Sequence, residues 1–75
     1  MKIRYVIHHL KSDAKIISRW TQDLADKDFA VAEDLIQKAA SDKLDYFQIY
    51  GEDDTVVVFG KEILKECIFE IKKKD

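Results

Sequence analysis

Apolar and polar side chains alternate along the first ten residues, which is the pattern of a β-strand with one face in a core. In the stretch KIRYVIHHL, Ile3, Tyr5 and Ile7 occupy every second position, among residues that are mostly β-branched or aromatic. The polar tetrapeptide KSDA then predicts a tight turn. The following stretch, KIISRWTQ, is expected to pair back antiparallel with the first strand.

A turn at Ser12 and Asp13 places Tyr5 opposite Trp20, and an aromatic cross-strand pair stabilises a hairpin by up to about 1 kcal/mol. Residues 13–25 have a second interpretation, because their apolar positions also recur at helical spacing and Ser12 could cap a helix. We favour the strand, since a helix here would leave the first strand without a sequence-adjacent partner.

A spacing of three and four residues predicts one amphipathic helix, beginning near Asp26 or Asp28 and ending at about Ala40. Its apolar stripe consists of Phe29, Ala32, Leu35, Ile36, Ala39 and Ala40. The aspartates at its start suit the positive end of the helix dipole. We expect this helix to pack on a sheet.

Three further strands are predicted after the helix, at about 46–50, at 55–60 and in the stretch ECIFEI. The first two are joined by GEDD, a turn in which Gly51 is expected to take a positive φ angle. Every position from Val56 to Phe59 is apolar, which predicts an interior strand of the sheet. With one helix to cover one face, the other face of this strand needs cover from a partner surface.

The predicted order of elements is therefore ββαβββ, with βααβββ as the alternative if residues 13–25 form a helix. The expected fold class is α+β, with a single helix packed on one face of a mostly antiparallel five-stranded sheet. No proline, low-complexity run or repeat divides the sequence. Residues 1–75 are expected to form a single compact domain.

The composition is that of a globular protein, with 47% hydrophobic and 37% charged residues. The one cysteine cannot form an intrachain disulfide, and no basic segment leads into an apolar signal stretch. No apolar run approaches the roughly 20 residues of a membrane span. We therefore expect a soluble, cytoplasmic protein without a membrane partner.

Charge is segregated along the chain although the formal net charge is only −2. Residues 1–20 contain five basic and one acidic side chain, whereas residues 21–54 contain three basic and ten acidic ones. A solvated helix and an acidic turn explain this pattern without any partner. The alternative is an electrostatic docking surface for a basic partner.

Residues that could carry catalysis are few. His8 and His9 are adjacent on a predicted strand, so their side chains point to opposite faces and cannot share a metal ion. Cys67 lies on the apolar face of the last predicted strand, where a thiol usually serves packing. There is no glycine-rich phosphate loop. We therefore predict a protein that is not an enzyme and uses no metal or cofactor.

Direct binding of nucleic acid is a third hypothesis, behind protein binding and self-association. Basic residues of the first 20 positions, interleaved with Tyr5 and Trp20, could form a basic surface with stacking aromatics. These basic residues are Lys2, Arg4, Lys15 and Arg19. The acidic side chains of the predicted helix and the negative net charge of the chain argue against nucleic-acid binding.

The layout of the chain resembles that of small phage-encoded anti-CRISPR inhibitors with a five-stranded sheet and one helix. The resemblance lies in the Asp28–Phe29 start and alanine stripe of the helix, the Tyr46–Gly51 strand and turn, and the Val57–Phe59 strand. It implies a viral protein that binds a host defence complex in the host cytoplasm and blocks access of nucleic acid. It carries over no functional residue.

The leading hypothesis is a non-catalytic protein-binding module, in the form of a phage or mobile-element inhibitor that occludes a basic nucleic-acid-binding surface of a host defence complex. Its partner-binding residues are predicted to be Glu33, Asp34, Glu52, Asp53 and Asp54. The partner would be a protein with a basic surface, such as a nucleoprotein complex. The alternative is a homodimeric structural or assembly protein that pairs its open sheet faces or edges.

Overall fold

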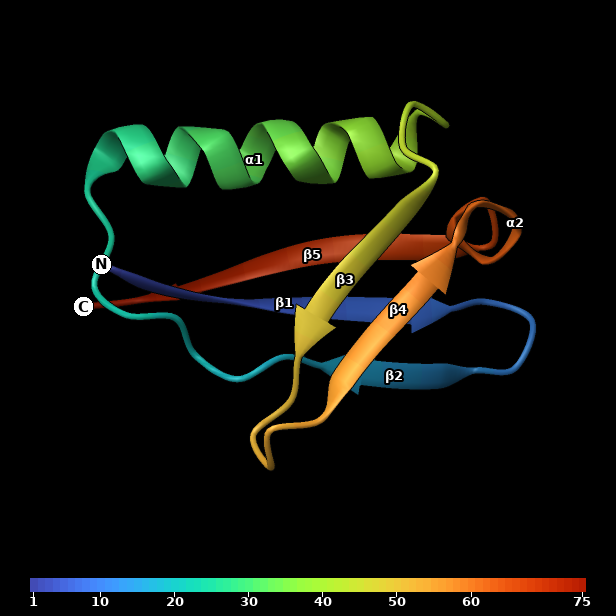
Figure 1. Cartoon of the computed structure of the whole chain (residues 1–75), viewed down its shortest axis with the longest axis horizontal. Helices are drawn as coiled ribbons and strands as arrows, with labels where there is room; N and C mark the ends of the chain where they lie inside the picture. Colours follow the sequence, from blue (N-terminus) through green and yellow to red (C-terminus); the bar gives the residue numbers. More distant parts are fainter.

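The computed structural model describes all of residues 1–75, which form an α+β fold with one main helix and two antiparallel sheets (Figure 1). The elements are β1 (Lys2–His9), β2 (Ala14–Ile17), α1 (Asp26–Ala40), β3 (Tyr46–Tyr50), β4 (Val56–Gly60), α2 (Lys61–Leu64) and β5 (Cys67–Lys74). No helix of the structure has both the length and the apolar character that crossing a membrane requires.

The prediction of a single five-stranded sheet is wrong, because the strands divide into a three-stranded sheet, β2-β1-β5, and a two-stranded sheet, β3-β4. Figure 1 shows the β3-β4 hairpin crossing in front of the larger sheet, with α1 alongside it. One helix would leave much of a five-stranded face bare. Stacking the hairpin on the same face as the helix supplies the missing cover from within the chain.

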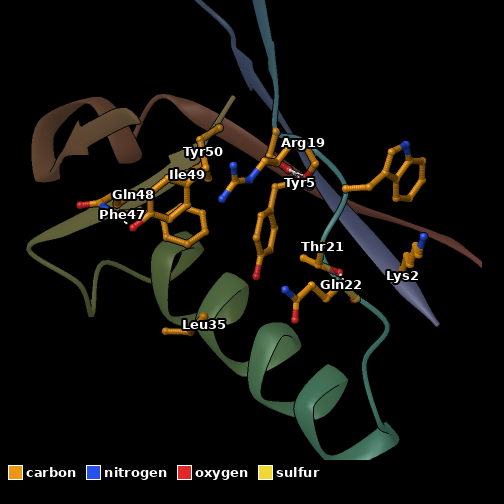
Figure 2. Close-up of a pocket in the computed structure, with 12 residues that line it drawn as sticks. Lys2, Tyr5, Arg19, Thr21, Gln22, Leu35, Phe47, Gln48, Ile49 and Tyr50 are labelled. Atoms are coloured by element: carbon orange, nitrogen blue, oxygen red, sulfur yellow. Dashed lines mark hydrogen bonds between the residues drawn. The ribbon is translucent and has the colours of Figure 1, made fainter. Parts of the chain in front are cut away.

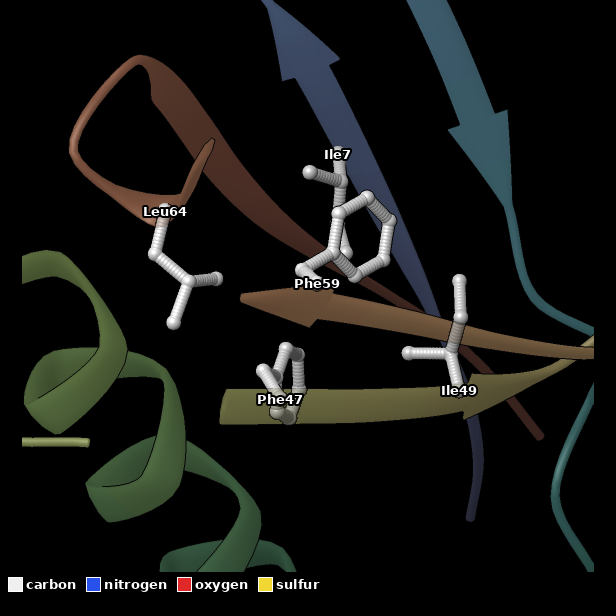
Figure 3. Close-up of a cluster of buried hydrophobic side chains, with 5 residues drawn as sticks. All are labelled: Ile7, Phe47, Ile49, Phe59 and Leu64. Atoms are coloured by element: carbon white, nitrogen blue, oxygen red, sulfur yellow. The ribbon is translucent and has the colours of Figure 1, made fainter. Parts of the chain in front are cut away.

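The core lies between the two sheets and is small. Its five buried side chains come from β1, β3, β4 and α2 (Figure 3). They are Ile7, Phe47, Ile49, Phe59 and Leu64. The Phe47 ring meets the rings of Tyr5 and Phe69 edge-on, at centroid distances of 5.4 Å and 6.2 Å. This geometry suits aromatic quadrupoles and joins β3 to both β1 and β5.

The main helix is confirmed at Asp26–Ala40, with Asp26 and Asp28 in its first turn. Its buried positions are Ala32 and Ala39, whose small side chains let the helix approach β5 closely. Residues 13–25 contain no helix, so the alternative βααβββ order is wrong.

The predicted register of the first hairpin is wrong by two residues. β1 pairs with β2 so that Val6 lies opposite Ile17, which puts the turn at residues 10–13. Asp13 ends that turn at a φ of 57°, a left-handed conformation that aspartate tolerates. A shift of two residues keeps every side chain on its predicted face. It separates Trp20 from Tyr5, and Ser18 donates its N–H to the Tyr5 carbonyl instead.

The prediction that Val56 to Phe59 form an interior strand is also wrong. β4 has one partner strand, β3, and its side chains alternate between core and solvent. In the turn before it, Asp54 takes the positive φ, at 62°, and Gly51 does not. The sequence also gave no signal for α2, which connects β4 to β5.

Candidate protein-binding surface

The outward face of the β3-β4 hairpin gathers exposed aromatic and β-branched side chains. Five residues of the two strands form what we call the hairpin surface: Tyr46, Gln48, Tyr50, Val56 and Val58. Gln48 lies opposite Val58 and Tyr50 opposite Val56. The exposed fractions are 60% for Tyr46 and 46% for Tyr50, and 49% and 57% for the two valines. The two tyrosines and the two valines are four of the ten large hydrophobic residues that are exposed in the whole chain.

The hairpin surface is held in place by the buried side chains on the opposite face of the same strands. Phe47 and Ile49 alternate with the surface residues of β3 and are 6% and 2% exposed. On the outer face, the Gln48 amide donates to the Tyr50 hydroxyl at 2.9 Å, and the Arg19 guanidinium lies 5.2 Å from the Tyr50 ring centroid. The aromatic groups are therefore presented from a rigid strand, an arrangement that limits the entropy lost on binding.

A groove of about 780 Å³ runs beside the hairpin surface, between β3, the segment after β2 and α1 (Figure 2). Tyr5 points into it from β1, Thr21 and Gln22 line one side, and Leu35 of α1 lies opposite. Burial raises the pKa of Tyr5 above its ordinary value of 10.0. Six of the twelve residues that line the groove are hydrophobic, and the other six are polar or charged, with Lys2 and Arg19 among them.

The edge of β3 that borders this groove is open for most of its length. The Tyr50 carbonyl accepts the Arg19 N–H at 2.8 Å, which shows that this carbonyl points away from β4. Alternate residues of an antiparallel strand direct their backbone groups to the same side, so Gln48 also directs its N–H and C=O away from β4. A strand edge beside an apolar groove is the geometry used to add an extended peptide to a sheet.

The acidic residues predicted to bind a partner do not form one cluster. Glu33 and Asp34 lie in the middle of α1, whereas Glu52, Asp53 and Asp54 lie in the turn between β3 and β4, at the far end of the hairpin (Figure 1). Asp34 forms an ion pair with Lys38 at 2.9 Å, and Glu33 forms none.

The three acidic residues of the turn all have partners within the chain. Glu52 pairs with Arg4, and Asp54 lies 3.3 Å from the Arg19 guanidinium. Asp53 accepts the Thr55 N–H, and hydrogen bonds from Thr55, first from its side chain and then from its backbone, lower the pKa of the Asp53 carboxyl group. The ion pair of Glu52 with Arg4 ties the turn to β1, and that of Asp54 with Arg19 ties it to the segment after β2. A role of the five residues in binding a partner stays a prediction.

A polar network that the sequence did not reveal joins the first turn to the start of β5. The His9 ring lies between the Ser12 hydroxyl, 2.6 Å from Nδ1, and the Glu66 carboxylate, 2.7 Å from Nε2. Glu66 also pairs with Lys11 at 2.8 Å. Serine, histidine and a carboxylate in this order also occur in acyl-transfer triads, but here neither groove of the structure is lined by any of them. The network closes the end of the β2-β1-β5 sheet.

Acid is expected to weaken this network. Hydrogen bonds from Lys11 and then from His9 hold the pKa of Glu66 below its ordinary value of 4.5. A lowered folded-state pKa contributes stability that is complete above the ordinary value and is lost as the pH falls through the folded-state value. Urea denaturation of the wild type should therefore show stability falling below pH 4.5, and Glu66→Gln should reduce that dependence. An unchanged pH profile in Glu66→Gln would contradict this assignment.

The cysteine is partly buried, and its thiol donates to the Ile63 carbonyl at 3.2 Å. Burial, with a smaller effect of the Glu66 charge, raises the pKa of Cys67, which lowers its thiolate fraction and reactivity at neutral pH. No group of three or more histidine, cysteine, aspartate or glutamate side chains is arranged to hold a metal ion.

Comparisons of the chain with protein-family models, with curated proteins and with solved structures found no match. The function must therefore be inferred from the surfaces of this chain.

Proposed function

We propose that the chain is a non-catalytic protein-binding module that docks through the hairpin surface. The observation that carries this proposal is the exposure of two tyrosines and two valines on one face of a rigid hairpin. Tyrosine is enriched at the centres of protein interfaces, because it brings large contact area with few rotatable bonds. The groove along the open edge of β3 extends the same surface and would take an extended segment of the partner.

More specifically, we propose that the chain is an inhibitor that occludes a basic, nucleic-acid-binding surface of a host defence complex. Its charged contacts would then come from Glu33 and Asp34 on α1, because Glu33 forms no ion pair and Asp34 pairs only with the exposed Lys38 of the same helix. The turn residues are poorer candidates for reversal, since changing Glu52 or Asp54 would break ion pairs within the chain.

The test is a photo-crosslinking residue placed at Tyr46, in the cells in which the protein is naturally made. We expect one discrete protein adduct, and we expect Val58→Asp in the same chain to abolish it. The control position is Val31, which is equally exposed, at 59%, but lies on α1. Equal adducts from both positions, or an adduct that survives Val58→Asp, would contradict docking by the hairpin surface.

The same experiment separates the two kinds of partner. An adduct of twice the chain mass of 8.8 kDa identifies the partner as a second copy. Self-association has a specific structural basis, because β4 is an edge strand with no charge or proline between Val56 and Phe59, and such edges pair readily. For a different partner, Glu33→Lys with Asp34→Lys should weaken the adduct if that partner is basic.

A further inference from the structure

The outer face of the β2-β1-β5 sheet is covered by no other element. Ile7 of β1 and its neighbour Phe69 on β5 contact the hairpin, so the hairpin and α1 lie on the face that carries these residues. Side chains alternate along a strand, so the opposite face carries Lys2, Arg4 and His8 of β1. On this face Lys2 and the β5 residues Ile68, Glu70, Lys72 and Lys74 are exposed, whereas Val6 of β1 is buried, at 1% exposure. The face lies on the far side of the sheet from the hairpin surface, and Lys2 and Trp20 also line the groove beside β3.

The register of β1 with β5 concentrates positive charge at one end of this outer face. Lys2 lies opposite Lys74, and Arg4 lies opposite Lys72 in the next row. Like charges directly opposite each other destabilise a sheet, and an anion placed between them removes that repulsion. These four residues stand where both chain termini lie close together (Figure 1).

Charges within the chain neutralise this cluster only in part. Arg4 is paired with Glu52, and Lys72 lies 3.9 Å from Glu70. Lys2 and Lys74 form no ion pair with any residue of the chain, and both are exposed. The cluster therefore keeps free cations in spite of the net charge of −2, because the acidic residues of α1 lie on the opposite side of the sheet.

The only tryptophan of the chain lies beside these cations. The Arg4 guanidinium is 4.5 Å from the Trp20 ring centroid, and the Lys74 ammonium group is 4.3 Å from it. The backbone before and after Trp20 is fixed to β1, because Ser18 and Thr21 donate their N–H groups to carbonyls of β1. An aromatic ring is thus held, partly exposed, next to a row of lysines.

We infer that this outer face binds single-stranded nucleic acid, with phosphates on Lys2, Lys72 and Lys74 and a base that takes the place of the Lys74 ammonium group over the Trp20 ring. A basic surface with an aromatic side chain is the usual device for binding single strands without sequence preference. Lys72 and Lys74 are two residues apart on one strand, about 6.7 Å, which lets them contact consecutive phosphates of an extended chain. A duplex is a poorer fit, since reading its major groove takes a projecting helix or ribbon and this face is a flat sheet.

The experiment uses the intrinsic fluorescence of Trp20, which reports directly on the proposed site. The purified chain is titrated with a single-stranded DNA oligonucleotide of mixed sequence at about 20 mM salt, where screening is weak. We expect the fluorescence to be quenched on binding. The affinity should fall with salt at a log–log slope of about −2, which corresponds to three lysine–phosphate contacts.

Two double variants distinguish an effect of the proposed site on affinity from an effect of the overall net charge. Lys72→Glu with Lys74→Glu should weaken binding at least about tenfold. Lys61→Glu with Lys65→Glu changes the net charge equally, at two lysines on and just after α2, and should leave the affinity within about twofold. Far-ultraviolet circular dichroism confirms that both variants fold.

Three results would overturn the inference. The first is no quenching by the oligonucleotide at low salt. The second is equal weakening by the two pairs of substitutions, which would reduce the effect to overall charge. The third is equal or tighter binding to a duplex or to anionic lipid vesicles, which would assign the face to another partner. Lys72 and Lys74 belong neither to the hairpin surface nor to its groove, so docking by the hairpin surface is tested separately, by crosslinking at Tyr46.

Discussion

Replacing Phe47 by alanine should lower the free energy of unfolding by about 3–5 kcal/mol, the usual cost of removing a buried phenylalanine. Phe47 is 6% exposed and packs edge-on against Tyr5 and Phe69, so it contacts both β1 and β5 from β3. A domain of this size has about 4–11 kcal/mol of stability in total. Phe47→Ala should therefore remove a large share of the total stability, measured as a lower midpoint of urea denaturation.

The neighbouring residue provides the control for Phe47. Tyr46 is 60% exposed and points away from the core, so Tyr46→Ala should change the free energy of unfolding by no more than about 1 kcal/mol. Comparable losses in the two variants would mean that the hairpin does not pack on the larger sheet with Phe47 inward. The comparison thus tests the division of the strands into two stacked sheets.

The second large effect is expected at Arg4. Only 18% of its side chain is exposed, and it contacts three separate parts of the chain. Its Nε donates to the Ser18 carbonyl at 2.9 Å, its terminal nitrogen pairs with Glu52, and its guanidinium stacks on Trp20. Arg4→Ala should cost about 2 kcal/mol, because hydrogen bonds to charged groups contribute more than neutral ones.

Two variants decide whether the geometry of Arg4 matters or only its charge. Arg4→Lys should recover less than half of the loss, since an ammonium group cannot reproduce the planar fork. Arg19 also pairs with an acidic residue of the turn and stacks on an aromatic ring, but 49% of its side chain is exposed. Arg19→Ala should therefore cost less than about 1 kcal/mol in thermal or urea denaturation. Full recovery of the lost stability in Arg4→Lys would show that the positive charge, and not the planar guanidinium group, provides the stabilisation.

The main helix and most strands were predictable because their signals are local, but the strand predicted over KIISRWTQ ends at Ile17, so residues 18–22 were wrongly predicted as strand. The apolar residues of the stripe at 29–40 recur at helical spacing only, and the helix Asp26–Ala40 forms as predicted. Tyr46–Tyr50 lies between clear turn residues and also matches. The last strand begins at Cys67 and runs three residues beyond the predicted end, into Lys72–Lys74, because pairing with β1 continues there.

The arrangement of the strands was not predictable, because it depends on distant parts of the chain. An apolar run such as Val56 to Phe59 suits an interior strand, but it also suits a hairpin strand whose outer valines stay exposed. The local pattern is the same in both cases. The choice follows from Phe47 and Phe59, which are buried in one cluster with Ile7 of β1, and from the contact of Phe47 with Phe69 of β5.

The candidate surface was harder still to find. The distribution of charge along the sequence indicated the acidic turn as a binding site. In the structure, Arg4 and Arg19 form ion pairs with residues of that turn, although they are more than thirty positions away in the sequence. Tyr46 and Tyr50 were visible at alternate positions of a strand, and this spacing was the available signal for an exposed aromatic face. Lys72 and Lys74 become part of a basic cluster only through their pairing with β1.

The position of β1 at the centre of its sheet has a consequence for how the chain folds. The central strand β1 is synthesised before the other four strands, yet one of its two partners is β5, which follows all of them, with Lys2 opposite Lys74. Closing so long a loop precedes any gain from the pairing, and folds dominated by such contacts form in milliseconds to seconds. While the chain emerges from the ribosome, Ile3 and Ile7 stay without β5 beside them until Phe69 and Lys73 have been synthesised and have left the ribosome.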